Sequence, residues 1–311
     1  MNAIAHAASL ALAAAVAFAA PALADKGGMR YSIAVSKFEN KSQFPEGQFA
    51  LAATFTAVLT DSLQQTGRFI VLGEKDMRVE AIGEQDFAAS GRVAGGNKKP
   101  ETGQMTPAQL LVKGEITHFQ QSTGGGKTGI TFKGVTLGTE SDTAEINAVI
   151  YVVDSTTGQV VASRKVKGDA SRMGMQVGVS QLRGMTADLG AFKQTNVGTA
   201  VEKAIDQGVA FILGQLERIP WEGSVILVAK DGRVYINRGE REGVTRGQTF
   251  AVGTAERLRD PNSGEVLDVT MVKVGTIVVE QVRDKISIGK ATEGAGSIQK
   301  GMSVLLPSDG T

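Results

Sequence analysis

Residues 172–180 read RMGMQVGVS and alternate between apolar and small or polar side chains. Successive side chains of a strand point to opposite faces, so this period of two predicts a strand with one apolar face. That face would carry Met173, Met175, Val177 and Val179. A turn region at 183–188 follows, and the chain then returns with mixed small, polar and apolar residues. The stretch therefore predicts a β-hairpin over about 169–199.

A second segment, about 124–153, has the same character, although its pattern is less regular. Its predicted apolar face includes Ile130, Phe132, Ile146 and Ile150. Arms of about ten residues suit a tilted strand that crosses a bilayer, and such alternation is typical of membrane β-barrels. Ordinary half-buried strands alternate as well. The pattern alone thus leaves two structures open: membrane-spanning hairpins, and long hairpins that lie on a sheet.

The first 24 residues predict export by a signal peptide. An apolar, alanine-rich run over 9–20 precedes Ala22 and Ala24, which form a small-x-small cleavage site before Asp25. The run is too short to cross a membrane comfortably as a helix. We expect the mature protein to begin near Asp25, in an envelope or extracellular space.

Composition argues against an enzyme and against nucleic-acid binding. The net charge is +1 and aromatic residues make up 5% of the chain, which favours neither a phosphate backbone nor base stacking. Cysteine is absent, which excludes disulfides, thiolate metal sites and a cysteine nucleophile. His118 would be the only histidine left after cleavage, too few for a histidine-rich zinc site. We expect no catalytic residue, no metal and no cofactor.

The sequence GGGKTG at 124–129 raises the question of a nucleotide. A P-loop needs a glycine five residues before its Gly-Lys-Thr, and that position holds Gln121. A helix should also follow the lysine, whereas the residues after Lys127 have a strand pattern. The glycines are better explained as the start of the first hairpin. A P-loop enzyme stays as a third hypothesis, which predicts that Lys127→Ala removes nucleotide binding.

Two domains are predicted, over 25–220 and 221–311, with the boundary at Pro220-Trp221. The first mixes strands with helices expected at 49–65, 75–87, from Thr106-Pro107 onward, and at 201–216. The second has only short strands and glycine-rich turns, typical of a small barrel, with 266–274 and 275–282 as separate strands. The expected fold class is therefore α+β: an α/β sandwich that carries two hairpins, followed by an all-β barrel-like domain.

Several phrases occur in order along the chain: 57–63 with 68–74, then 110–116, 124–127, 150–161, 173–178 and 202–213. This ordered set, which spans about 31–221, resembles the CsgG family of curli secretion channels and HfaB-type holdfast relatives. In that family each subunit is a periplasmic α/β domain with two hairpins. Subunits form a ring, and the hairpins together close one outer-membrane barrel.

The resemblance implies a homo-oligomeric channel in the outer membrane that passes extended protein substrates, such as curli-like or adhesin subunits, without a nucleotide. Its partners would be the substrate and periplasmic accessory proteins, with no nucleic acid. The apolar hairpin residues would face lipid. The loop over 40–49 would narrow the channel, with Asn40, Gln43 and Phe44 nearest the constriction.

Two departures from the family pattern support an alternative. A lipidated cysteine usually follows the signal peptide, and here Asp25 follows Ala24. The C-terminal β domain is also additional, and it looks like the C-terminal domain of flagellar assembly protein T, a periplasmic docking module. The alternative function is therefore a soluble periplasmic adaptor, or a flagellar or envelope assembly component, that forms no pore.

Overall fold

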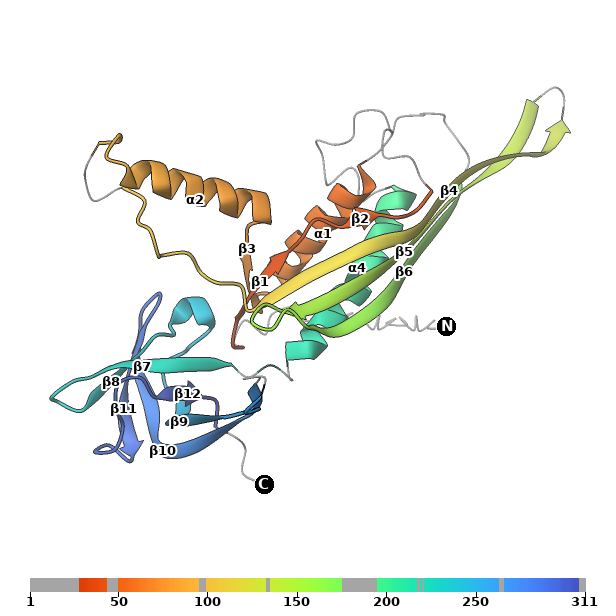
Figure 1. Ribbon diagram of the computed structural model, residues 1–311. Coiled ribbons are helices and arrows are strands. Elements are labelled where there is room, and N and C mark those ends of the chain that lie inside the picture. The colour runs from red at the N-terminus through yellow and green to blue at the C-terminus, as the bar shows by residue number, and fades with distance from the viewer. Residues whose placement is uncertain are drawn as a thin grey trace, which may run out of the picture.

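The structure is a computed structural model that describes residues 28–43, 50–94, 99–132, 135–174, 195–216, 219, 221–262 and 266–307. A mixed sheet with helices on one face is followed by a closed antiparallel barrel (Figure 1). The expectation of an α+β fold with a barrel-like C-terminal domain is confirmed at this level. The predicted signal peptide lies outside the described residues.

The sheet combines parallel and antiparallel pairing. The parallel part is centred on β1, which pairs parallel with both β3 and β4. The chain then continues as an antiparallel meander from β4 through β5 to β6. In spatial order the strands are β3 (Phe69–Leu72), β1 (Tyr31–Val35), β4 (Leu110–Phe132), β5 (Val135–Asp154) and β6 (Val160–Gly174), with β2 (Glu39–Asn40) paired beside β4.

Two helices cover one face of this sheet, α1 (Leu51–Gln65) and α4 (Asn196–Gln215). Their apolar residues recur at helical spacing and are buried against the strands. Helix α4 begins earlier than the expected residue 201, because Thr195 caps it: its hydroxyl accepts a hydrogen bond from the Gly198 amide at 2.9 Å.

The contact between α4 and the sheet is unusually close at one glycine. A Cβ on Gly168 in β6 would lie 1.7 Å from the Ala200 carbonyl oxygen. Gly208 on the helix faces Ile150 in the same way, with the Ile150 Cδ1 2.5 Å from where its Cβ would be. Small residues thus let the helix backbone rest directly on strands β5 and β6.

Helix α2 (Lys75–Ala89) stands apart from the sheet (Figure 1). Ala88 is its one buried residue. Its large apolar side chains are about half exposed: Met77, Val79, Ile82 and Phe87. The helix expected from Thr106-Pro107 does not form. This segment is extended and bound to β1 instead, because Ser32 Oγ donates to the Pro107 carbonyl at 2.7 Å.

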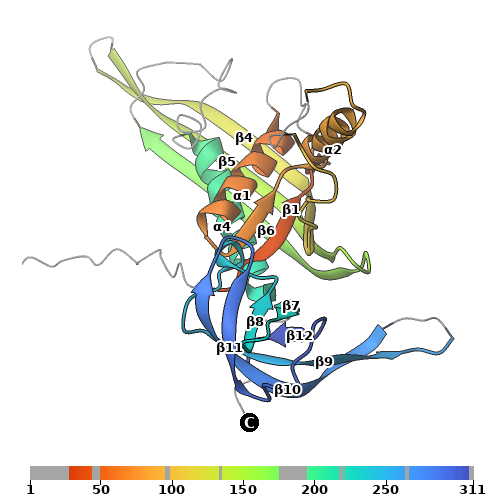
Figure 2. The same cartoon turned by 90° about the vertical axis from the view of Figure 1, so that its left-hand side faces the viewer.

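The barrel closes in the order β10-β11-β8-β7-β12-β9, and a long β9–β10 hairpin projects from it (Figure 2). The expected break between residues 274 and 275 is wrong. Gly275 lies at a register shift inside one continuous strand, at a close approach: its Cβ would be 2.5 Å from the Glu293 carbonyl oxygen. The strands are β7 (Glu222–Val228), β8 (Arg233–Ile236), β9 (Thr249–Arg259), β10 (Val266–Val282), β11 (Ser287–Glu293) and β12 (Ser303–Leu305).

Candidate functional site

Strands β4 and β5 continue beyond the part of the sheet that α4 covers (Figure 1). Helix α4 begins at Asn196, and this residue marks the end of the covered part: its Nδ2 donates to the Asp142 carbonyl at 2.9 Å. Past this point the β4–β5 ladder runs on from Gly124 opposite Ser141 to Phe132 opposite Val135. We call residues 124–132 and 135–141 the uncovered ribbon.

The glycine-rich stretch lies inside this ribbon. Gly125 pairs with Glu140 and Gly129 with Gly138, so three residues of β4 face a single residue of β5. This irregularity is a bulge in a ladder that then resumes. The residues after Lys127 continue as strand, so the strand-to-helix context that a P-loop requires is not found here.

Ile130 and Phe132, two of the expected lipid-facing residues, lie in the ribbon. In the ladder Ile130 is opposite Leu137 and Phe132 is opposite Val135, with Thr131 between them opposite Thr136. Met173 is near the end of β6, in register with Ser141. Met175, Val177, Val179 and most of the second predicted hairpin lie outside the described residues.

For Ile146 and Ile150 the expectation of lipid contact is wrong. Both side chains are 0% exposed and belong to the protein core. The physical reason is helix α4, which lies over this half of β5 and is close enough for Ile150 to meet Gly208. Their alternation comes from a half-buried strand in a protein, not from a membrane wall.

The expected constriction is described in part. Asn40 lies in β2, in register with Ile116 of β4, and its Oδ1 accepts hydrogen bonds from the Ser42 amide and hydroxyl at 3.0 and 2.6 Å. Gln43 is exposed directly after this turn. Phe44 lies outside the described residues. The start of the loop is therefore fixed against the sheet at Asn40, and its role in a channel stays a prediction.

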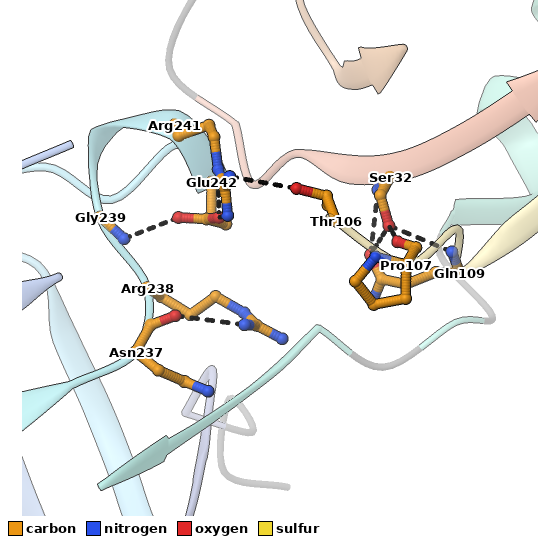
Figure 3. A network of polar contacts seen from close by, with 9 residues as sticks. All are labelled: Ser32, Thr106, Pro107, Gln109, Asn237, Arg238, Gly239, Arg241 and Glu242. Carbon is orange, nitrogen blue, oxygen red and sulfur yellow. Dashed lines mark hydrogen bonds and ion pairs between the residues drawn. The ribbon is translucent and has the colours of Figure 1, made fainter. Parts of the chain in front are cut away.

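The two domains meet in a packed seam, shown in Figure 3. The Arg30 amide donates to the Glu242 carbonyl at 3.0 Å, and Arg241 donates to the Thr106 hydroxyl at 3.2 Å. Gly243 has φ of 84°, and a Cβ there would lie 2.4 Å from the Gly28 carbonyl oxygen. The buried cores of the two domains form one contiguous cluster.

Trp221 anchors the connection at the start of the barrel. Its side chain is 3% exposed and stacks on Phe250 with ring centroids 5.1 Å apart. The guanidinium carbon of Arg238 lies 5.9 Å from the tryptophan ring centroid. Tyr31 ties the other side of the connection, because its hydroxyl donates to the Ile219 carbonyl at 2.9 Å. The barrel is thus held against the sheet domain by several independent contacts.

A polar pocket of about 230 Å³ opens at this seam. No sequence motif predicts this pocket, because its residues come from separate segments of both domains. Across the part of the chain that the structure covers, histidine, aspartate and glutamate side chains form no cluster able to hold a metal ion. Helices within the same ranges are too short or too polar to span a bilayer.

A family model described as "Curli production assembly/transport component CsgG" matches residues 15–232, well over half of the 311 residues. The chain belongs to the CsgG family. This membership indicates an exported protein with a transport-related role at the outer membrane or in the periplasm, in a family of assembly components. The match ends soon after β7, and the resemblance of the C-terminal domain to flagellar assembly protein T is not confirmed.

Several solved structures are similar to parts of this CsgG-family chain. The hypothetical protein CT253 from Chlamydia trachomatis is 15% identical, with 60% of this chain and 96% of that chain covered and a TM-score of 0.37. A PelC dodecamer from Paraburkholderia phytofirmans is 11% identical, with 58% and 89% covered and a TM-score of 0.26. Lipoprotein GNA1162 from Neisseria meningitidis is 14% identical, with 60% and 99% covered and a TM-score of 0.26.

No curated protein matches the chain significantly. The family model and the order of the sequence phrases both support membership of the CsgG family.

Proposed function

We propose that this CsgG-family protein forms a ring in the outer membrane, in which the hairpins of successive subunits close one channel for extended protein substrates. The observation that carries the proposal is the uncovered ribbon. It has nine residues in β4, 124–132, which is about the length that a tilted strand needs to cross a bilayer.

The ribbon also needs a partner. Two antiparallel strands are marginally stable alone in water, and an open sheet edge cannot lie in lipid. Among the described residues, the ribbon has no third strand beyond Glu140, which pairs with Gly174 of β6. A closed ring of subunits supplies the missing strands on both sides.

Helix α2 supports a ring for a separate reason. Its exposed large apolar side chains, Met77, Val79, Ile82 and Phe87, lie on one element that projects from the sheet. Apolar surface gathered on a projecting element favours a protein contact. A neighbouring subunit is the partner that a ring provides.

In this proposal transport uses no nucleotide, and the glycine-rich stretch, which is part of β4, belongs to the channel wall. The secreted substrate would pass as an extended chain, and the loop that begins at Asn40 would narrow its path. The C-terminal barrel would lie on the periplasmic side and contact accessory proteins.

Matched substitutions in the ribbon test this proposal. Ile130→Asp places a charge on the face expected to meet lipid, whereas Thr131→Asp places it on the opposite face. A charge facing lipid costs on the order of 2 kcal/mol in every subunit of the ring. We expect the Ile130 variant to leave the detergent-extractable membrane fraction and the Thr131 variant to stay in it. If the two variants fractionate like the parent protein, the membrane role of the ribbon is refuted.

The alternative, a periplasmic adaptor without a pore, is favoured by the firm packing of the closed barrel on the sheet domain. In that case the ribbon would pack on another protein. The adaptor predicts identical fractionation of both ribbon variants and no ring in membrane extracts.

A further inference from the structure

The pocket at the domain seam has walls from both domains. The sheet domain contributes Arg30, and the barrel contributes Arg238, Arg241, Glu242 and Lys285. Figure 3 shows Arg238, Arg241 and Glu242 on the barrel side, facing the segment of Thr106, Pro107 and Gln109 on the sheet side. With a volume of about 230 Å³, the pocket has room for a small polar group and its immediate neighbours.

The charges lining this pocket do not balance. Four cationic side chains accompany a single carboxylate, Glu242. That carboxylate is 5% exposed and already fully engaged: it accepts from Arg241 Nε at 2.8 Å and from the Gly239 amide at 2.9 Å. Glu242 therefore compensates Arg241, which also donates to Thr106.

The other three cations form no ion pair among the described residues, although the charges of Glu242 and Glu222 act on Arg238. Within the ranges that the structure covers, no ion pair involves Arg30, Arg238 or Lys285. The Arg30 Nε is buried and has no hydrogen-bond partner. A buried donor left unpaired is costly, so the Arg30 guanidinium, which lines the pocket, has unused hydrogen-bonding capacity.

Arg238 is also held in place. Its Nη1 donates to the Asn237 carbonyl at 3.2 Å, and its guanidinium lies over Trp221. Burial lowers the pKa of the Arg238 guanidinium below its ordinary value, while the nearby carboxylates of Glu242 and Glu222 act in the opposite direction. A guanidinium that is fixed in place and forms no ion pair is well suited to a planar or tetrahedral oxyanion.

We propose that this pocket is a binding site for an oxyanion, a carboxylate or a phosphate group, held by Arg30 and Arg238 with Lys285 at the exposed rim. The group is either free in solution or the acidic side chain of a peptide segment. Because the site has walls from both domains, an occupied pocket also holds the barrel against the sheet and raises the thermal stability of the protein.

Binding is measured on the full chain by calorimetry and by thermal unfolding, with sodium phosphate and with an acetylated tetraglutamate peptide, each against sodium chloride at equal ionic strength. We expect saturable binding of at least one probe and a matching rise in the unfolding temperature. Saturation by phosphate alone identifies a free ion, and saturation by the peptide identifies an acidic segment. Saturation by neither probe overturns the proposal.

Three variants locate the site. Arg238→Gln and Lys285→Gln should each weaken binding by about tenfold, as expected for the loss of a charged hydrogen-bond donor. Lys290→Gln is the matched control, an exposed lysine of β11 that does not line the pocket, and should bind like the parent protein. Lys285 is exposed, so its variant folds even if the Arg238 variant does not. Equal weakening in the Lys285 and Lys290 variants would show nonspecific attraction and refute the site.

Discussion

Strands β4 and β5 each have a half that α4 covers and a half that it does not. In the covered half, Ile116, Ile146 and Ile150 are 0% exposed. In the other half, the uncovered ribbon carries its ladder past the end of the helix. Apolar residues alternate with polar or small ones at 135–138 in the ribbon and at 144–148 in the covered half. The alternation alone therefore does not show whether a helix covers the strand. The position of the helix makes that distinction.

Among the substitutions that test the difference between the two halves, the largest loss of stability is expected at Ile150. Ile150→Asp places a carboxylate in the apolar core beneath α4, which should destabilise the domain by more than about 4 kcal/mol. Urea unfolding followed by circular dichroism measures this loss. Ile130→Asp in the ribbon should leave the same urea midpoint unchanged. A folded Ile150 variant with the parent midpoint would contradict the assignment of this half to the core.

Gly168→Ala tests how closely α4 lies on the sheet. The added methyl group would collide with the Ala200 carbonyl oxygen, so we expect the free energy of unfolding to fall by about 3 kcal/mol. Urea unfolding followed by circular dichroism measures this loss. Gly214→Ala is the matched control, because no atom lies within 4 Å of its Cβ position and alanine favours a helix. The control should be as stable as the parent or up to about 1 kcal/mol more stable.

Asn196→Ala acts at the boundary between the two halves. It removes the hydrogen bond to the Asp142 carbonyl, and Asn196 is 8% exposed, so a loss of about 1–2 kcal/mol is expected. Hydrogen exchange should be faster at the start of α4 and in β5 around Asp142. Gln215→Ala, at the far end of the helix, should leave exchange at this boundary unaltered. Uniformly faster exchange over the whole sheet would mean that the bond has no local role.

The smallest effect concerns the exposed pair of Lys167 and Glu145, whose Nζ and Oε1 are 3.0 Å apart. The hydrogen bond from Lys167 holds the pKa of Glu145 below its usual value. Between the lowered and the usual pKa, the unfolded chain binds more protons, so this contribution is present above the usual pKa and is lost as the pH falls. Lys167→Gln should flatten the pH dependence of the urea midpoint between about pH 5 and pH 3. The part of the pH dependence that is lost should correspond to the titration of about one carboxyl group. An unchanged pH profile would show that the pair contributes nothing.

Sequence patterns predicted strands mixed with helices α1, α2 and α4 in the first domain, and the C-terminal barrel, because periodicity and turn residues act locally. They failed where tertiary contact decides. Thr106-Pro107 has a helix-start signature, but bonds to Ser32 hold this segment extended. Gly275 suggested a strand end, yet it serves a close approach inside β10.

The candidate sites were predictable to different degrees. The start of the ribbon could be recognised from its glycines and from the strand pattern after Lys127. Ile146 and Ile150 could not be assigned correctly, because nothing within β5 tells that a helix about fifty residues later covers them. The seam pocket could not be predicted from the sequence, since Arg30 and Arg238 line the same pocket only because the two domains pack together.

Electron microscopy of the full-length protein extracted from membranes in detergent tests the central claim most directly, namely that the uncovered ribbons of several subunits close one barrel. The account predicts closed rings with a central pore for the parent protein, and none for the Ile130→Asp variant. Single subunits, or particles without a pore, from a parent protein that is fully folded would contradict it.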